Sequence, residues 1–288
     1  MRFGVCGDMS LATVAAQASY DYAEWSVPAL LRPRESEDAF RASLDALRRA
    51  ELPYPVLNCF VPGDMKITGP DVDEPALENF VATSMARAET AGVEIIVLGS
   101  GGARRIPDGF DPCIAHDQLV AFCRMVGPLA HDHGVTVVVE PLNKTECNIL
   151  TTVSECAALV NEVAHPGIRL LVDAYHLMHD NDSYESIVMH GTLLAHAHIA
   201  TIPNRLAPAA EDCDFSGFFG ALTKARYSGR ISIEGRIANP EAELPAALAM
   251  MRKMSEVAME NDSNSPMQAT PRHRQHRRSQ TLRPTASP

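Results

Sequence analysis

The sequence contains no long hydrophobic run and no segment typical of a secretory signal. Every apolar stretch is much shorter than the roughly 20 residues that a membrane-spanning helix needs, which excludes such a helix. The first ten residues, MRFGVCGDMS, contain neither an extended apolar segment nor a clear cleavage site. We therefore expect a cytoplasmic protein that has no membrane partner.

The sequence also lacks close pairs of cysteines. None of the seven cysteines forms a C-x-x-C pair with another, and their number is odd. These features argue against a zinc knuckle or a redox pair. They are typical of cysteines that serve as small buried hydrophobic residues in a reducing cytoplasm.

Basic residues are scarce over most of the chain. The net charge of −11 argues against a general nucleic-acid surface. From Ser263 onward, however, the chain has five arginines and no acidic residue. This segment is rich in Ser, Pro and Gln and has almost no bulky apolar residues, so we expect a folded domain over residues 1–260 and a disordered tail over 261–288. The tail is interpreted as a solvated extension, with binding to RNA or a protein partner as the alternative.

Short apolar runs alternate with longer amphipathic segments along the domain. The eight expected strands are residues 3–6, 24–27, 55–60, 94–98, 135–139, 168–172, 193–199 and 230–233. Each is followed by a helical pattern, and the expected helices are residues 11–22, 35–50, 74–91, 114–133, 152–163, 183–190, 215–225 and 241–258. Eight strand-then-helix units at this length predict a single-domain (β/α)8 TIM barrel, although a doubly wound sheet of two halves would show the same alternation.

The fifth expected strand shows most clearly where a site would lie. Its β-branched run, Val135–Val139, fits a strand that is buried on both faces. The run ends on Glu140 and then Pro141, and a proline cannot continue a central ladder. A carboxylate therefore stands at the carboxyl end of a parallel strand, where ligands bind in such folds.

The next three strands also end on residues that bind metals. Asp173 follows the sixth strand, His196 and His198 lie in the seventh, and Glu234 follows the eighth. Taken singly, each has a structural interpretation: Asp173 as a helix cap, the two histidines as core residues and Glu234 as part of a solvated turn. Together with Glu140, these residues stand on four consecutive strands. This arrangement indicates a hard, oxygen-rich metal site suited to Mn²⁺, Mg²⁺ or Co²⁺.

At these residues the chain resembles the xylose isomerase-like TIM barrels, and within them the sugar phosphate isomerase/epimerase branch that includes the ketose 3-epimerases. The resemblance covers Met1–Met254. The motifs that carry it are E-P-L-N-x-x-E-C-N at Glu140–Asn148, D-x-x-H at Asp173–His176, H-x-H at His196–His198, the late Glu234 and the GSGGAR loop at Gly99–Arg104.

The resemblance implies roles for individual residues and one divalent ion, with Mn²⁺ favoured over Mg²⁺ and Co²⁺. The implied metal ligands are Glu140, Asp173, His198 and Glu234. The implied sugar-binding residues are Glu146, His176 and Arg205, of which Arg205 stands one residue later than usual in IPNR. His196 is then a structural neighbour of the metal. Relatives often form dimers or tetramers, so a homo-oligomer is possible.

The same groups suggest a reaction. A divalent ion can polarise a ketose carbonyl, acidify the adjacent C–H and stabilise the enediolate. Glu140 and Glu234 are the expected pair that removes and returns the proton. Return on the opposite face epimerises the carbon, and return to the neighbouring carbon isomerises the sugar. We therefore predict a metal-dependent sugar isomerase or epimerase that acts on a small sugar or sugar derivative.

Several alternatives stay open at this point. An inosose dehydratase or an enzyme of oxidised glycosides would use the same cluster, and a non-catalytic sugar-binding barrel would belong to another class. An endonuclease on the same barrel would need more histidines. Gly99–Arg105 (GSGGARR) is either a cradle for a substrate phosphate or a tight loop with two exposed arginines.

Overall fold

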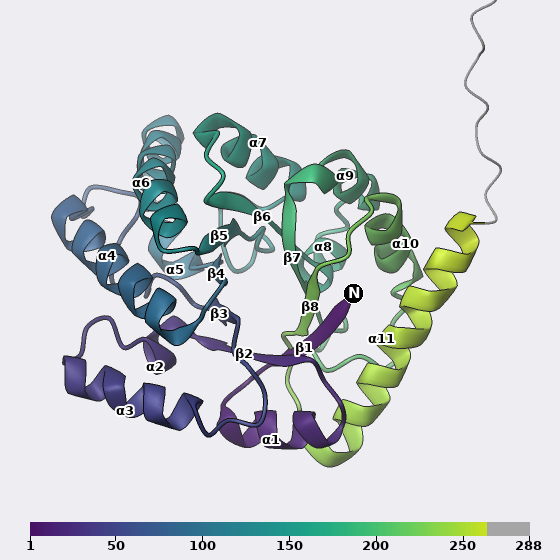
Figure 1. Cartoon of the computed structure of the whole chain (residues 1–288). Coiled ribbons are helices and arrows are strands. Elements are labelled where there is room, and N and C mark those ends of the chain that lie inside the picture. Colours follow the sequence, from purple (N-terminus) through teal and green to yellow (C-terminus); the bar gives the residue numbers. More distant parts are fainter. Residues whose placement is uncertain (264–288) are drawn as a thin grey trace, which may run out of the picture.

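The computed structural model describes residues 1–263, in which eight parallel strands form a closed barrel (Figure 1). Strand β1 pairs with β2 on one side and with β8 on the other, which closes the sheet. This confirms the predicted TIM barrel and excludes the open sheet. The strands are β1 (Arg2–Cys6), β2 (Tyr22–Ser26), β3 (Val56–Asn58), β4 (Ile95–Leu98), β5 (Thr136–Val139), β6 (Ile168–Asp173), β7 (Leu194–Ile199) and β8 (Arg230–Ile233).

Long helices form a ring around the barrel (Figure 1). They are α1 (Met9–Gln17), α3 (Glu37–Leu47), α4 (Glu74–Ala91), α6 (Pro112–Asp132), α7 (Val153–Val163), α10 (Ser216–Lys224) and α11 (Pro240–Ser263). The first helix ends earlier than predicted, because Tyr22 already belongs to β2. The last helix runs to Ser263, beyond the predicted end near Ala258.

Short helices follow several strands directly. They are α2 (Val27–Leu30), α5 (Gly101–Arg104), α8 (Ala174–His179) and α9 (Tyr184–Met189), with a 3₁₀ turn at Gly191–Leu193. Only α9 was predicted, as residues 183–190. Segments of four to six residues are too short to show a full pattern of period 3.6, so periodicity did not reveal α2, α5 and α8 and marked α9 only poorly.

Helix α4 shows how local signals set an element's limits. Its first turn is capped by Asp73, whose carboxylate accepts a hydrogen bond from the N–H of Ala76 at 3.0 Å, and Pro75 lies in that turn. It ends at Gly92, which adopts the left-handed conformation with φ +73°. These signals are visible in the sequence, and the predicted range for this helix is correct.

The barrel interior has a small apolar cluster of its own. Its buried members point inward from five strands and are Tyr22, Val56, Ile95, Val97, Val138 and Leu171. Tyr22 lies beside Gly4 of the neighbouring strand, where a Cβ atom would stand 2.3 Å from the Tyr22 ring. Glycine at position 4 therefore makes room for an aromatic ring inside the barrel.

Replacing Gly4 with Ala should lower the free energy of unfolding by about 1–3 kcal/mol, because the ring has to shift within a packed interior. Urea unfolding measures the change. The control is Gly220→Ala in α10, where a Cβ atom would meet nothing within 4 Å. That change should raise stability by about 0.5–1 kcal/mol. Equal stability of the two variants would contradict this account of Gly4.

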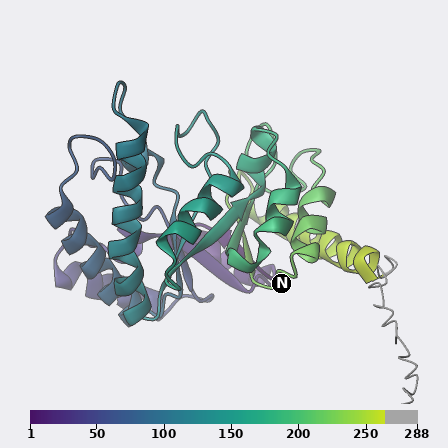
Figure 2. The ribbon, with the colours of Figure 1, turned by 90° about the horizontal axis from the view of Figure 1, so that it is seen from above.

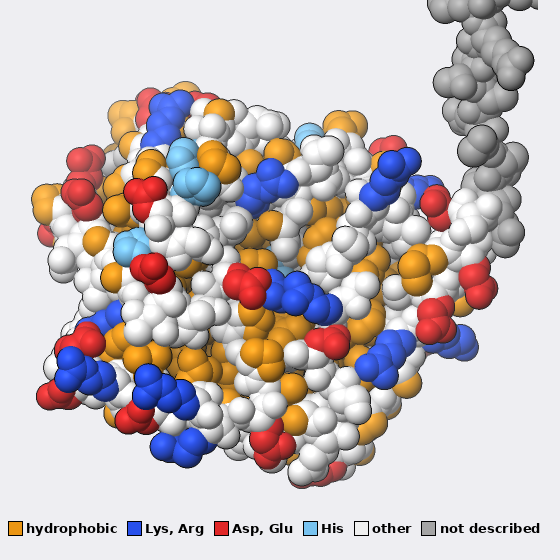
Figure 3. All heavy atoms as spheres, in the orientation of Figure 1, with side chains coloured by type: hydrophobic (Ala, Val, Ile, Leu, Met, Phe, Trp, Pro, Cys, Tyr) orange, Lys and Arg blue, Asp and Glu red, His pale blue; other side chains and the backbone are white. Residues whose placement is uncertain are grey.

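The strands begin at one face of the barrel and end at the other. Figure 2 shows the N-terminus on one side of the ring, where the strands begin, and the loops that follow the strands lie on the opposite side. Figure 3 shows the face toward the viewer of Figure 1, on which basic and acidic side chains are interspersed. This face therefore carries no large field of one sign.

The cysteines correct one expectation. All seven lack a disulfide, but only Cys123, Cys147 and Cys156 are buried, whereas Cys59 and Cys113 are exposed. The number of cysteines and their spacing along the sequence therefore do not predict which of them are buried. Within residues 1–263, no helix combines the length and the apolar character needed to cross a bilayer. The predicted disordered tail lies outside the described residues, except for 261–263, which continue α11.

Candidate metal centre and active site

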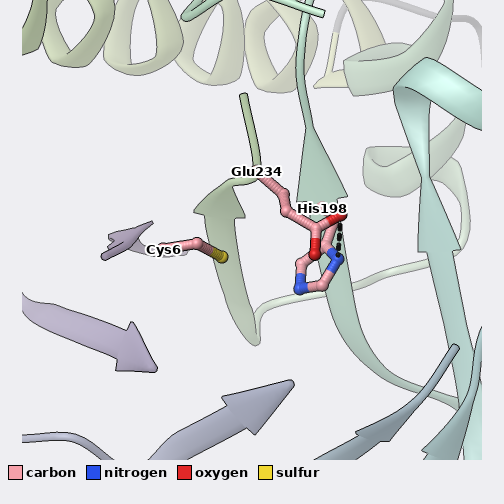
Figure 4. Close-up of side chains that lie close together, drawn as sticks. All are labelled: Cys6, His198 and Glu234. Carbon is pink, nitrogen blue, oxygen red and sulfur yellow. Dashed lines mark ion pairs between the residues drawn. The ribbon is translucent and has the colours of Figure 1, made fainter. Parts of the chain in front are cut away.

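The four predicted metal ligands meet at the carboxyl ends of strands β5 to β8. Ligand atoms of Glu140, Asp173, His176 and Glu234 all lie within 4.8 Å of one another. The Nδ1 atom of His198 is 3.0 Å from Glu140 Oε1 and 3.5 Å from Glu234 Oε2. Three carboxylates and two imidazoles, contributed by neighbouring strands, therefore form one cluster. Figure 4 shows the His198–Glu234 pair and Cys6 beside it.

Two atoms of this cluster are buried without a hydrogen-bond partner among residues 1–263. They are Oδ2 of Asp173 and Nε2 of His176. The other oxygen of Asp173 accepts the N–H of Tyr175 at 2.7 Å and so caps α8, as one interpretation of the sequence had it. A buried polar atom without a partner is costly unless a ligand satisfies it. The cluster therefore fits a cation together with polar groups of a substrate.

The hydrogen bonds of His176 fix its tautomer. The backbone N–H of Asn143 donates to Nδ1 at 3.1 Å, and the side-chain amide of Asn143 lies 2.9 Å from the same atom. Nδ1 must hold a lone pair there, so the proton of the neutral ring is on Nε2. That N–H points toward Asp173 Oδ2, 3.6 Å away. His176 thus presents a donor to the cluster.

In His198 the atom that faces the cluster is Nδ1, whereas in His176 it is Nε2. The Nε2 atom of His198 lies 3.0 Å from Oε1 of Glu24, a fully buried residue of β2. An ionised carboxylate only accepts hydrogen bonds, so Nε2 carries a proton toward Glu24. Nδ1 faces Glu140 and Glu234, to which it donates in the ion-free protein, and it offers a lone pair to a cation once that proton is displaced. The sequence analysis missed Glu24. The available signal was a single carboxylate within the otherwise apolar strand YAEWS.

The carboxylates of the cluster have pKa values that are shifted in different directions. Burial, together with the charge of Glu234, raises the pKa of Glu140. The same two causes raise the pKa of Asp173 to about 6. Burial also acts on Glu234, but the charges of His198 and Arg205 outweigh it and lower the pKa of Glu234 to about 2. Such a crowded set of carboxylates attracts a cation and contains groups with opposite proton preferences.

Burial and the neighbouring charges also shift the pKa values of the histidines and of Glu24. Burial alone would lower the pKa of His198, but the carboxylates of Glu24 and Glu234 raise it well above its usual value. Burial lowers the pKa of His176, which stays neutral. The carboxylate of Glu24 has its pKa lowered, because the two nearby imidazoles outweigh its burial.

Arg205 connects the cluster to the barrel mouth. Its guanidinium donates to Glu234 Oε2 at 2.6 Å and to Glu146 Oε1 at 3.1 Å. It also stacks over the ring of Tyr175 at 4.7 Å. Its unusual position in the sequence therefore does not remove it from the cluster. Tyr175, which the sequence analysis missed, supports the guanidinium.

The GSGGARR loop differs from both interpretations of its arginines. Arg104 is completely buried and donates to the backbone carbonyls of Leu98 at 3.0 Å and Glu140 at 2.7 Å. It is neither exposed nor free to bind a phosphate, whereas Arg105 is exposed. A Cβ atom at Gly99 would lie 2.3 Å from Glu140 Oε2. The loop therefore holds the strand end and leaves room for the Glu140 carboxylate.

Two further residues reach the cluster from strands β1 and β3. The sulfur of Cys6, at the end of β1, lies within 4.8 Å of ligand atoms of His198 and Glu234. Asn58, at the end of β3, donates to Glu234 Oε1 at 3.4 Å. The sequence analysis assigned neither residue, because a single cysteine or asparagine at a strand end carries no motif.

The chain is similar to known proteins over most of its length. The family of xylose isomerase-like TIM barrels matches residues 12–254. An L-ribulose 3-epimerase of Methylomonas sp. (strain DH-1) is 29% identical over 229 residues, which are 76% of this chain and 75% of that protein. A 3-dehydro-D-guloside 4-epimerase of Escherichia coli (strain K12) is 29% identical over 172 residues, which are 56% of this chain and 62% of that protein.

Solved structures show the same fold. A D-psicose 3-epimerase, crystallised in the presence of D-fructose, superposes with a TM-score of 0.77 at 17% identity. The match covers 88% of this chain and 99% of that structure. A 3-keto-D-glucoside 4-epimerase of E. coli gives a TM-score of 0.72 at 20% identity, with 88% and 99% coverage.

Proposed function

This chain belongs to the family of xylose isomerase-like TIM barrels, and we propose that it is a metal-dependent sugar epimerase or isomerase that removes a proton next to a ketose carbonyl. The observation that carries the proposal is the cluster at the strand ends. It combines three buried or half-buried carboxylates with the Nδ1 atom of His198 and two unpartnered buried polar atoms. The matched relatives are named epimerases and isomerases.

The donor set supports one divalent cation held by Glu140, Asp173, His198 and Glu234. His198 offers the lone pair on Nδ1, whereas His176 turns an N–H toward the cluster. Three carboxylates and one imidazole suit Mn²⁺ best, with Mg²⁺ and Co²⁺ as further candidates. When bound, such an ion acts as a Lewis acid that acidifies the C–H next to a carbonyl.

Glu140 and Glu234 are the proposed acid and base. Their carboxylates approach Nδ1 of His198 from β5 and β8, and their pKa values are shifted in opposite directions. Glu140 therefore holds a proton more readily, whereas Glu234 stays ionised and has a free oxygen lone pair to accept one, as proton abstraction and return require. Transfer from one face of the carbon to the other inverts it, which is epimerisation.

The remaining polar groups would bind and orient the sugar. The Nε2–H of His176 is directed into the cluster and can donate to a substrate oxygen. Arg205 and Glu146 lie at the mouth, where their side chains are 28% and 39% exposed. Arg104 is already bound to backbone carbonyls, so it does not supply a phosphate site. This favours a free sugar over a phosphorylated one.

Deuterium uptake tests the proposal. The Mn²⁺-loaded protein is incubated with a panel of free ketoses in D₂O, and mass spectrometry follows incorporation at the carbon next to the carbonyl. We expect uptake with at least one ketose, and product analysis then separates epimerisation from isomerisation. Removal of the ion with a chelator should abolish uptake, and adding back Mn²⁺ should restore it.

A second candidate substrate class is the oxidised glycosides. The E. coli relative and one superposed structure are named as 4-epimerases of a dehydro-guloside and a keto-glucoside. These compounds also have a C–H next to a carbonyl, so the same residues would serve. Deuterium uptake from a 3-keto-glucoside but from no free ketose would favour this class. Uptake from neither class, with the ion demonstrably bound, would contradict the proposed function.

A further inference from the structure

We propose that Glu24 is a positioning residue that fixes the tautomer and the orientation of His198, so that Nδ1 of His198 presents a lone pair to the divalent cation. Glu24 lies one layer below the cluster, inside the barrel. It is therefore out of reach of a substrate and acts only through His198. The inference rests on the proposed metal site and adds a residue to it.

The position of Glu24 is unusual for a barrel interior. TIM barrels fill this space mainly with branched apolar side chains. A carboxylate with no exposed surface is costly there unless hydrogen bonds satisfy it. Both of its oxygens are occupied: Oε1 by Nε2 of His198 at 3.0 Å, and Oε2 by Nε2 of His196 at 3.0 Å and by the Ser232 hydroxyl at 2.6 Å.

The hydrogen bonds around Glu24 form a chain in which each group donates toward the Glu24 carboxylate. Ser232 gives its hydroxyl proton to the carboxylate, so it accepts from the hydroxyl of Tyr22, 2.9 Å away. His196 lies next to His198 with ring centroids 4.9 Å apart, and its Nδ1 has no partner among residues 1–263. Its close bond is to Glu24, through Nε2. Tyr22, Ser232 and His196 thus hold Glu24 in a single orientation.

That orientation decides what His198 can do. When a cation displaces the proton on Nδ1 of His198, the ring keeps one proton, and the carboxylate acceptor at Nε2 holds it on that side. If the proton were on Nδ1, it would bond to Glu140 at 3.0 Å and leave no lone pair for a cation. A carboxylate behind a ligating histidine also makes the ring a stronger ligand. Glu24 therefore supports metal binding without touching the metal.

Measurement of Mn²⁺ affinity tests this role without reference to turnover. Electron paramagnetic resonance of free Mn²⁺ gives the dissociation constants of the wild type and of Glu24→Gln, which keeps the shape of the side chain. We expect binding to be weaker by about 10–100-fold in Glu24→Gln. The control is Glu94→Gln, the same substitution at a glutamate whose carboxylate binds Arg230 at 2.8 Å at the other end of the barrel, away from the cluster. It should change the affinity by less than about threefold.

The tautomer itself supplies a second readout. In the Mg²⁺-loaded, ¹⁵N-histidine-labelled wild type, long-range ¹H–¹⁵N NMR should find His198 protonated at Nε2 and unprotonated at Nδ1. Glu24→Gln should shift the ring toward a mixture, which a purely structural role would not do. A proton on Nδ1 in the loaded wild type would overturn the inference, whether or not the variant folds.

The outcomes separate the inference from the proposed function. Wild type that takes up no Mn²⁺ would contradict the metal site, and the role of Glu24 with it. Wild type that binds Mn²⁺, with Glu24→Gln binding it within twofold, would contradict the role of Glu24 alone.

Discussion

Replacing Glu234 with Gln should reduce turnover by about 10²–10⁴-fold while the protein stays folded and retains sugar binding. The amide keeps the size of the side chain and can still accept from Arg205, but it cannot accept or return a proton. The loss should therefore appear mainly in kcat. Deuterium uptake should fall in parallel, because proton removal is the step that the change prevents. Glu140→Gln should have a similar effect.

A matched control lies on the opposite face of the barrel. Glu94 is another glutamate next to a strand, and its carboxylate binds the guanidinium of Arg230 at 2.8 Å, away from the cluster. Glu94→Gln should leave kcat within about twofold of the wild type. If Glu234→Gln turned over as fast as this control, Glu234 would not be the acid or base. If the wild type bound a sugar but never exchanged its protons, the non-catalytic sugar-binding barrel would be the better account.

Replacing Arg104 with Met should lower the free energy of unfolding by about 2–4 kcal/mol. The side chain is fully buried, and it joins the end of β4 to the end of β5 through the carbonyls of Leu98 and Glu140. Methionine fills much of the same space but donates no hydrogen bond. The two carbonyls then lose charged donors in a region that water does not reach. Urea unfolding of the metal-free protein measures the loss.

The neighbouring arginine is the control for this prediction. Arg105 is exposed, so Arg105→Met should change stability by no more than about 0.5 kcal/mol. Because Arg104 binds the carbonyl of Glu140 itself, Arg104→Met should also weaken Mn²⁺ binding, whereas Arg105→Met should not. Equal stability of the two variants would mean that Arg104 is not needed to hold the strand ends together.

The sequence alone located the strands and favoured a barrel over an open sheet, and the structure confirmed the closure. Apolar runs with β-branched residues, alternating with amphipathic segments, are local patterns, and they located all eight strands to within a few residues. Parallel strands that close into a ring bring their carboxyl ends together. For this reason Glu140, Asp173, a histidine of the seventh strand and Glu234 were expected to meet. The family resemblance singled out His198, and the structure places these four residues in one cluster.

Only the tertiary structure decided which neighbours complete that cluster. Glu24 is 172 positions from His196 and 174 from His198, and no local pattern connects them. The sequence predicts Arg104 as an exposed loop residue. Its guanidinium is nevertheless buried, because the loop folds back over the strand ends. The tautomers of His176 and His198 likewise depend on which group each ring faces. Periodicity determines which face of a strand a residue occupies, but contacts across the barrel depend on closure, which only the folded chain provides.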